Sequence, residues 1–557
     1  MANRLPVLPG LMQDFQLTTN AVLQHAKNFH GDREIVTNTV EGPKHRYTYA
    51  DLEKRAGILA HCLRENFDVK PGDIIGTMAW NTYRHMEIWY AVMGIEAVVH
   101  TLNPRLFPDQ LSYIANHAGD KMLFFDFDLT ELVEKELAPR FDTIQNYIIM
   151  TDKKTMPRHY SLPSTHCYED LLAATSSKAY PFPWPEINEQ AACALCYTSG
   201  TTGNPKGVLY SHRSQVLIGI MCCTPACFGL GAMDTMLPVV PMFHANAWAI
   251  VFAGPISGCK LALPGSRLDG PTLHNFFESE GVTCTAAVPT VWLALLQHLK
   301  ETKSKLTTLN RVVIGGSACP PAVLEAFENV YGVEVRHAWG MTELSPIGTV
   351  FTMTPTEAGK NPEEQMAAKL KQGRPIFGVE MKITDDDGKE LPRDGKSFGH
   401  LMVRGPMTVK EYMRADGGKL LDEEGWFDTG DVAVLEPEGL MRITDRSKDV
   451  IKSGGEWISS IEIENEAVGH PQVAEAAVIG VQHPKWGERP LLVVVKEPNA
   501  SITKEDVLAF LVGRIAKWWM PDDVVFAESI PHTATGKIAK KALREQFEKY
   551  TFPKAKL

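Results

Sequence analysis

The chain has 557 residues, more than a single hydrophobic core usually organises, so we expect at least two domains. Its composition, 44% hydrophobic and 22% charged residues, is that of a globular protein. The formal net charge of -11 argues against general electrostatic capture of nucleic acid or an anionic membrane, although a small anion can still bind at a local site.

Helical and strand-like segments alternate along the first part of the chain. Thr48 and Asp51 form a capping box, after which apolar residues recur at helical spacing. The pattern then predicts a strand at 74–78, a helix at 86–98, and strands at 122–125, 191–197, 282–288 and 312–314. Short apolar strands separated by helices indicate an α/β fold in which parallel sheets are covered on both faces.

The pattern changes after Asp445. Strands are predicted at 476–481, 491–496 and 524–530, with a helix from about 505 to 519. We therefore divide the chain into a large N-terminal domain, 1–445, and a small α+β C-terminal domain, 446–557, which is within the usual range of domain sizes.

The cysteines and the apolar segments indicate a cytoplasmic protein. None of the ten cysteines follows Cys319, and the Cys193–Cys196 pair has no second pair or histidines nearby, so buried reduced thiols are favoured over a metal site. The N-terminus lacks the apolar core of a signal peptide. The longest apolar stretch, 245–259, is too short to span a bilayer; we expect a buried helix there and no stable membrane insertion.

A glycine-rich segment, YTSGTTGNPKG at 197–207, follows a predicted buried strand. Its glycines let backbone N–H groups approach an anion, and its hydroxyl groups and lysine add donors and a positive charge. The order Gly-Lys-Ser/Thr of the Walker loop is absent, which counts against P-loop enzymes. The predicted phosphate-binding residues of the loop are Thr198, Ser199, Gly200, Thr201, Thr202, Gly203 and Lys206.

This loop resembles the signature loop of the adenylate-forming superfamily, which contains acyl-CoA synthetases, luciferases and the adenylation domains of peptide synthetases. Further motifs resemble those of the family and follow its order, at 241–248, 315–318, 339–343, 425–431, 445–449 and 531–537. The resemblance covers nearly the whole chain. It implies a large adenylate-forming domain with parallel-rich sheets flanked by helices, and a small, mobile C-terminal domain. It also implies an enzyme, an AMP-forming acid–thiol ligase, that activates a carboxylic acid with ATP and Mg²⁺ and transfers the acyl group to CoA.

The resemblance also implies roles for individual residues. Thr201 and Glu343 would serve the Mg²⁺ ion, Lys537 would bridge the carboxylate and the α-phosphate, and His244 would lie near the carboxylate. Asp431 would accept hydrogen bonds from the ribose hydroxyls. The remaining residues of the implied nucleotide site are Gly316, Ser317, Ala318, His337, Ala338, Trp339, Gly340, Met341, Thr342, Ile443 and Arg446. Two departures from the family pattern are Trp339, where tyrosine is usual, and His400, where many relatives carry an acid.

In the family the small domain rotates between the two half-reactions, about a residue that corresponds to Lys448. The rotation would present a second face for attack by the thiol. The implied CoA residues on that face are Lys452, Ser453, Gly454, Gly455, Glu456 and Trp457.

The segment 242–248 resembles the acyl-pocket segment of bacterial medium- and long-chain fatty acyl-CoA synthetases and of methylthiopropionate-CoA ligases. His244, Trp248, Gly315 and Met341 would then line the acyl site, with Trp248 either gating a tunnel or packing in the core. The implied acid is a fatty or short- to medium-chain acid, methylthio-substituted acids included. Three alternatives stay open: a luciferase-like or other adenylate-forming enzyme with a different acceptor, a peptide-synthetase module, and a non-catalytic binding protein. The related synthetases include dimers that exchange N-terminal segments, so residues 1–16 are a candidate dimerisation arm for a homodimer.

Overall fold

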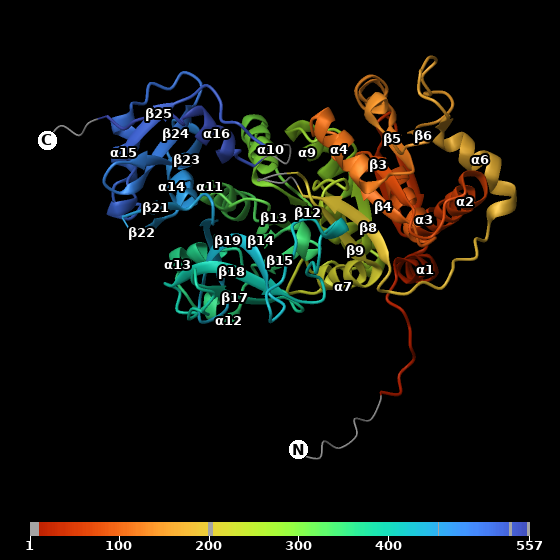
Figure 1. The fold of residues 1–557 in the computed structure, drawn as a ribbon, viewed down its shortest axis with the longest axis horizontal. Coiled ribbons are helices and arrows are strands. Elements are labelled where there is room, and N and C mark those ends of the chain that lie inside the picture. The colour runs from red at the N-terminus through yellow and green to blue at the C-terminus, as the bar shows by residue number, and fades with distance from the viewer. Residues whose placement is uncertain (1–9, 199–203, 455, 534–536, 554–557) are drawn as a thin grey trace.

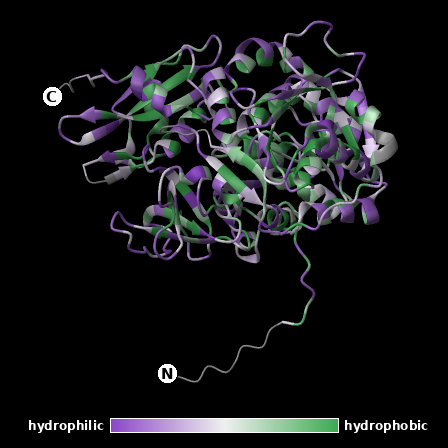
Figure 2. Cartoon of the chain, turned by 45° about the vertical axis from the view of Figure 1, so that its right-hand side comes forward, coloured by the Kyte–Doolittle hydropathy of each residue, from purple (hydrophilic) through white to green (hydrophobic). Residues whose placement is uncertain are grey.

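The computed structural model describes residues 10–198, 204–454, 456–533 and 537–553. The predicted fold class is confirmed: two large parallel-rich sheets flanked by helices, a four-stranded sheet, and a small C-terminal domain with a sheet of its own. Figure 1 shows the small domain at one end of the molecule, with α1, α2, α3 and α6 at the other. Hydrophobic residues gather on the strands and the inner helix faces, whereas hydrophilic residues lie outside (Figure 2).

The first large sheet has seven strands in the order β7-β6-β5-β3-β4-β8-β9. All neighbours are parallel except β8 and β9, which form an antiparallel pair. Its strands are β3 (Ile74–Met78), β4 (Val98–Thr101), β5 (Met122–Asp126), β6 (Asn146–Met150), β7 (Thr165–Cys167), β8 (Ala192–Tyr197) and β9 (Gly207–Ser211). The helices of this part are α2 (Tyr49–Phe67), α3 (Tyr83–Met93), α4 (Pro108–Ala118), α5 (Thr130–Leu132) and α6 (Tyr168–Ala179). The predicted capping box begins α2: Thr48 and Asp51 each accept the backbone N–H of the other.

The second large sheet has nine strands in the order β16-β15-β14-β13-β12-β10-β11-β1-β2. The strands from β14 to β1 are parallel, and the edge pairs β1–β2, β14–β15 and β15–β16 are antiparallel. They are β1 (Glu34–Asn38), β2 (Lys44–Thr48), β10 (Thr235–Pro238), β11 (Lys260–Leu263), β12 (Cys284–Ala287), β13 (Arg311–Ile314), β14 (Glu334–Gly340), β15 (Ile347–Val350) and β16 (Arg374–Pro375). The accompanying helices are α1 (Thr19–His30), α7 (His212–Cys223), α8 (Ile250–Ser257), α9 (Gly270–Glu280), α10 (Pro289–Thr302), α11 (Pro321–Glu325), α12 (Pro355–Ala358) and α13 (Pro362–Lys369).

The four-stranded sheet is antiparallel and leads directly into the small domain. It consists of β17 (Glu380–Thr384), β18 (Phe398–Arg404), β19 (Phe427–Leu435) and β20 (Met441–Arg446). The small domain contains β21 (Ile451–Ser453), β22 (Glu456–Ile458), β23 (Val473–His483), β24 (Gly487–Lys496) and β25 (Asp523–Phe526), with α14 (Ser460–Val468), α15 (Lys504–Leu511) and α16 (Lys540–Gln546). Its sheet carries a separate hydrophobic cluster on each face.

Three predicted helices differ from the observed ones. The helix predicted at 86–98 spans Tyr83–Met93, and Val98 begins β4. The helix predicted at 505–519 ends at Leu511, because Val512 is extended and Gly513 has a positive φ of 78°. The helix predicted at 245–259 begins only at Ile250. The five preceding residues, Ala245–Ala249, all have φ between 44° and 61°, a left-handed turn that costs non-glycine residues roughly 1–2 kcal/mol each. Tertiary contacts hold this turn, including a hydrogen bond of 2.9 Å from the Asn246 amide to Gln215.

No helix in the described part of the chain is long and apolar enough to cross a membrane. All ten cysteines are free thiols. Cys193 and Cys196 lie buried in β8, and burial raises the pKa of Cys196 to about 11, so this thiol is protonated at neutral pH.

Candidate active site

A cavity of about 530 Å³ lies where the carboxyl ends of parallel strands from both large sheets meet. Many of the wall residues lie just after the carboxyl end of a strand: Trp80 and Asn81 after β3, Asn103 after β4, Thr198 after β8, Val239 after β10, Val288 after β12 and Gly315 after β13. Ligands of open α/β sheets bind at such carboxyl ends. Residues 446–448, which include the predicted hinge residue Lys448, and Lys537 complete the wall from the direction of the small domain.

Both ends of the phosphate loop reach this cavity. Thr198, Asn204 and Lys206 line it, and the Thr198 N–H donates to the Lys206 carbonyl at 2.9 Å, which closes the base of the loop. The other loop residues of the prediction lie outside the described part of the chain: Ser199, Gly200, Thr201, Thr202 and Gly203. The predicted metal role of Thr201 therefore stays a prediction.

Glu343 faces the cavity from a short turn after β14 and is buried. The Tyr412 hydroxyl donates to its Oε1 at 2.7 Å. Burial raises the pKa of the Glu343 carboxyl, and the hydrogen bond from Tyr412 opposes that rise. Because Mg²⁺ prefers carboxylate oxygens, Glu343 fits the predicted role of metal ligand.

Asp431 and Arg446 lie opposite each other on β19 and β20. The Asp431 carboxylate is buried and accepts hydrogen bonds from the Trp339 indole N–H, at 2.9 Å, and from Arg446 Nε, at 2.8 Å. It lies behind the cavity wall, which Thr429, Gly430 and Arg446 form. A ribose diol that reached Asp431 would therefore have to share the carboxylate with these two donors.

The other predicted nucleotide residues divide into two groups. Those on the cavity wall are Gly316, Ala338, Trp339, Gly340, Met341 and Thr342. Those outside the wall are Ser317, Ala318, His337 and Ile443. His337 is fully buried and its Nδ1 pairs with the Leu370 carbonyl at 2.9 Å, so its contact is with the protein interior.

Lys537 enters the same cavity from the small domain, so the two most distant motifs of the prediction share one site. Burial and the nearby Arg446 lower the pKa of its ammonium to about 8, while Asp431 and Glu343 act in the opposite direction. His244 also lines the cavity; burial and the nearby Lys537 lower the pKa of its imidazole to about 4. The imidazole is therefore neutral at physiological pH, while Lys537 is largely protonated.

The predicted acyl residues also lie on this wall: His244, Trp248, Gly315 and Met341. Trp248 extends from the left-handed turn toward Gly315. A Cβ at Gly315 would come within 3.0 Å of the indole and 2.9 Å of the Ala338 carbonyl, so only glycine fits there. Apolar residues continue the wall: Val239, Val240, Ala287, Val288 and Ile347.

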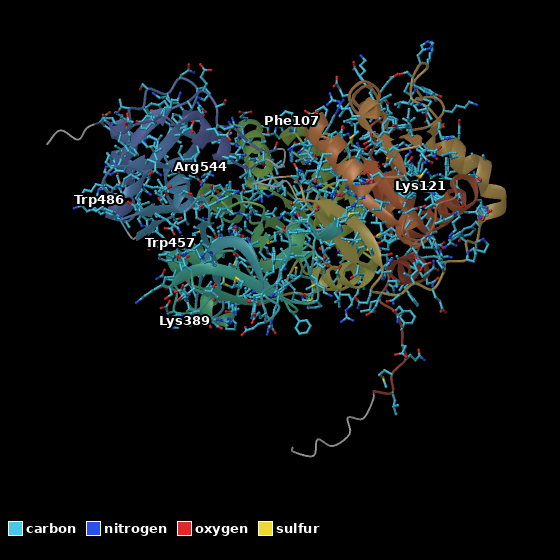
Figure 3. All side chains as sticks on the ribbon, in the orientation of Figure 1. Phe107, Lys121, Lys389, Trp457, Trp486 and Arg544 are labelled. Atoms are coloured by element: carbon cyan, nitrogen blue, oxygen red, sulfur yellow. The ribbon has the colours of Figure 1, made fainter. Side chains whose placement is uncertain are left out.

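Of the predicted CoA residues, Lys452, Ser453, Gly454 and Trp457 lie outside the cavity wall. The Trp457 ring packs near Phe398 and His400 of β18, with ring centroids 5.4 Å and 6.1 Å away, and the Lys452 ammonium lies 5.1 Å from the Trp457 ring. Figure 3 shows Trp457 where the small domain meets the four-stranded sheet. Gly455 and the Glu456 side chain are outside the described part. Ser453 is buried, and its hydroxyl accepts a hydrogen bond from Arg489 at 3.3 Å, while Gly454 lies against Trp486 and Trp518.

His400, which departs from the family pattern, contacts Ser447, next to the predicted hinge residue. Its Nδ1 lies 3.3 Å from the Ser447 hydroxyl, next to Lys448, and its Nε2 lies 2.9 Å from Asp386. Lys448 itself lines the cavity.

Tyr412 and Arg105 are among the polar wall residues that the sequence prediction missed. Tyr412 contacts Glu343 across 69 residues and also lies 5.0 Å under the Lys206 ammonium, which no local pattern reveals. The Arg105 guanidinium lies 5.7 Å from the Trp80 ring and 5.8 Å from the Phe243 ring. The strand before it, β4, was not predicted, so the sequence offered no signal for Arg105.

Comparison with known proteins identifies the family. The model of the AMP-binding enzyme family matches residues 23–413, and that of the AMP-binding enzyme C-terminal domain matches residues 462–537. A 3-methylmercaptopropionyl-CoA ligase from Ruegeria lacuscaerulensis is 46% identical over 97% of this chain and 99% of its own length. A medium-chain-fatty-acid–CoA ligase from Ectopseudomonas oleovorans is 44% identical over 97% of both chains.

Among solved structures, an anthranilate CoA ligase in complex with anthranoyl-AMP shares the fold. Its TM-score is 0.83 at 22% identity, over 96% of this chain and 99% of that one. The predicted family is therefore confirmed, and the chain belongs to the AMP-binding enzymes of the adenylate-forming superfamily.

Proposed function

We propose that this protein is an ATP-dependent acyl-CoA ligase, an AMP-forming acid–thiol ligase. The observation that carries the proposal is the convergence of the phosphate-loop ends, Glu343 and Lys537 on one cavity between the two domains. The similarity to CoA ligases over nearly the full length of the chain agrees with it.

In the first half-reaction, a carboxylate oxygen of the acid attacks the α-phosphorus of ATP, and pyrophosphate leaves. Both reactants are anions, so holding them together and neutralising charge are the main tasks of the site. Lys537 supplies a positive charge beside the reacting oxygens, Arg446 adds a second, and neutral His244 offers a hydrogen bond near the carboxylate. Bound Mg²⁺, held by Glu343 and Thr201, would neutralise phosphate charge.

In the second half-reaction, the CoA sulfur attacks the acyl carbonyl and AMP leaves. The present arrangement suits the first step, because Lys537 reaches the cavity while Lys452 and Trp457 lie against the four-stranded sheet. We propose that the small domain, from residue 446 onward, rotates about Lys448 to bring the face formed by residues 452–457 to the cavity.

The acid is a fatty or short- to medium-chain carboxylic acid, with methylthio-substituted acids included. The wall around Trp248 is apolar, and a cavity of about 530 Å³ has to hold the nucleotide as well as the acyl chain. We propose Trp248 as the side chain that limits chain length.

The assembly we propose is a cytoplasmic homodimer in which the N-terminal segment contacts the partner. Leu11, Met12 and Phe15 are 89%, 87% and 73% exposed, on a segment that extends away from the body of the protein (Figure 1).

The test is release of AMP and pyrophosphate with a panel of acids, short to long and with or without sulfur, in the presence and absence of CoA. The proposal expects AMP release to need both the acid and CoA, with the thioester as product. AMP release that depends on an acid but yields no CoA thioester would support the alternative, an adenylate-forming enzyme with a different acceptor.

A further inference from the structure

A set of hydrogen bonds crosses the hinge. The first residues of α14, which follow Lys448, pack against β20, which precedes it. The Ser459 hydroxyl donates to the Thr444 carbonyl at 2.6 Å. The Ser460 N–H donates to Asp445 Oδ2 at 2.7 Å, and the Ser460 hydroxyl donates to the same oxygen. All four of these residues are buried.

The same set extends to the segment that carries Lys537. Lys540, the first residue of α16, is buried, and its ammonium donates to the Ser460 hydroxyl. The ammonium also pairs with Glu464 Oε1 at 2.8 Å, and that oxygen accepts the Val478 N–H at 2.7 Å. Asp445, Ser460 and Lys540 therefore link the large domain to a point three residues from Lys537.

We propose that Ser460 and Lys540 are positioning residues, which latch the small domain onto Asp445 in the orientation that places Lys537 in the cavity. This inference rests on the proposed acyl-CoA ligase function. Rotation about Lys448 has to break the contacts to Asp445 and Thr444, since these residues stay with the large domain. The contacts among Ser460, Lys540 and Glu464 lie on one side of the hinge and can move as a unit.

The charges make this latch releasable. In the present orientation Glu464 pairs directly with the buried Lys540 ammonium, and Asp445 is linked to the same ammonium through the Ser460 hydroxyl. Burial raises the pKa of both carboxyl groups, that of Glu464 to about 7. Departure of Asp445 would leave the direct Lys540–Glu464 ion pair in place, so release of the latch would not leave the buried ammonium unpaired.

The experiment compares Ser460→Ala and Lys540→Met with a matched control, Arg544→Gln. Arg544 pairs with Asp449 at 2.6 Å, but both residues follow the hinge, so the control breaks an ion pair without touching the latch. Figure 3 shows Arg544 within the small domain. The adenylation step is followed as acid-dependent ATP–pyrophosphate exchange, and the transfer step as thioester formation from added acyl-adenylate and CoA. Trypsin cleavage after Arg446 and Lys448 reports opening of the hinge independently of activity.

We expect Ser460→Ala to lower the exchange rate about tenfold, because it removes the hydroxyl that bridges the charged groups of Asp445 and Lys540. Acyl transfer should be kept or become faster. Hinge cleavage should accelerate in this variant and stay at the wild-type rate in Arg544→Gln. The latch proposal is wrong if Ser460→Ala lowers pyrophosphate exchange and thioester formation equally, or if Arg544→Gln changes the exchange and cleavage rates in the same way. If Lys540→Met fails to fold, Ser460→Ala decides, since it leaves the Lys540–Glu464 pair intact. If the wild type shows no exchange with any acid, the proposed function fails, and the trypsin comparison alone then tests the latch.

Discussion

Replacing Lys537 tests the charge that the cavity places beside the reacting oxygens. In Lys537→Ala the developing negative charge loses its partner inside a buried site. Removing one such preorganised donor typically costs about 3–4 kcal/mol, or on the order of 10²–10³ in rate. We therefore expect acid-dependent ATP–pyrophosphate exchange to fall by about that factor. ATP binding should be largely kept, because the predicted adenine and ribose contacts come from the large domain.

The pH dependence of the wild type provides a second readout of the same residue. The pKa of Lys537 is lowered to about 8, so the ammonium is present below that pH and is lost as the pH rises through it. kcat/KM for adenylation, which reports the free enzyme, should therefore decline above about pH 8. Lys537→Arg is the control: a guanidinium stays charged, so whatever activity remains should lack this decline.

Two results would refute this reasoning. One is a Lys537→Ala variant that exchanges pyrophosphate at the wild-type rate. The other is a decline above pH 8 that persists unchanged in Lys537→Arg, because the titrating group would then be elsewhere.

Three further substitutions test the other parts of the site. Trp248→Ala removes the indole that lies against Gly315 and should shift the acyl preference toward longer chains with little change in the KM for ATP; an unchanged acyl profile would mean that Trp248 only packs in the core. Lys448→Pro restricts the hinge and should lower CoA thioester formation far more than adenylation, whereas equal losses would argue against rotation. Tyr412→Phe removes the hydrogen bond to Glu343 and should raise the Mg²⁺ concentration needed for half-maximal exchange several-fold; the assignment is wrong if the Mg²⁺ titration matches that of the wild type.

Local sequence patterns predicted the parts of the site that lie within one segment. The phosphate loop follows a strand in an uninterrupted stretch, and its composition alone indicated an anion site. Lys537 had no such signal: in a basic segment it reads as a surface charge, and only the family motif around it linked it to the loop.

The features that the sequence did not reveal depend on contacts between distant segments. The left-handed turn at Ala245–Ala249 contains no glycine, so backbone preference argued for a helix and tertiary packing overruled it. Tyr412 and Glu343 are far apart in the sequence, and only the folded structure brings them into hydrogen-bond contact. The packing of Trp457 against Phe398 of β18 depends on the orientation of the small domain.

The central claim is that this cavity joins a carboxylic acid to AMP before a thiol takes the acyl group. The most direct measurement is mass spectrometry of the enzyme incubated with ATP, Mg²⁺ and a medium-chain or methylthio-substituted acid, first without CoA and then with it. We predict an acyl-adenylate and pyrophosphate in the first stage, and conversion of the adenylate to acyl-CoA and AMP in the second. Formation of ADP and phosphate, or of a thioester without an adenylate intermediate, would contradict the account.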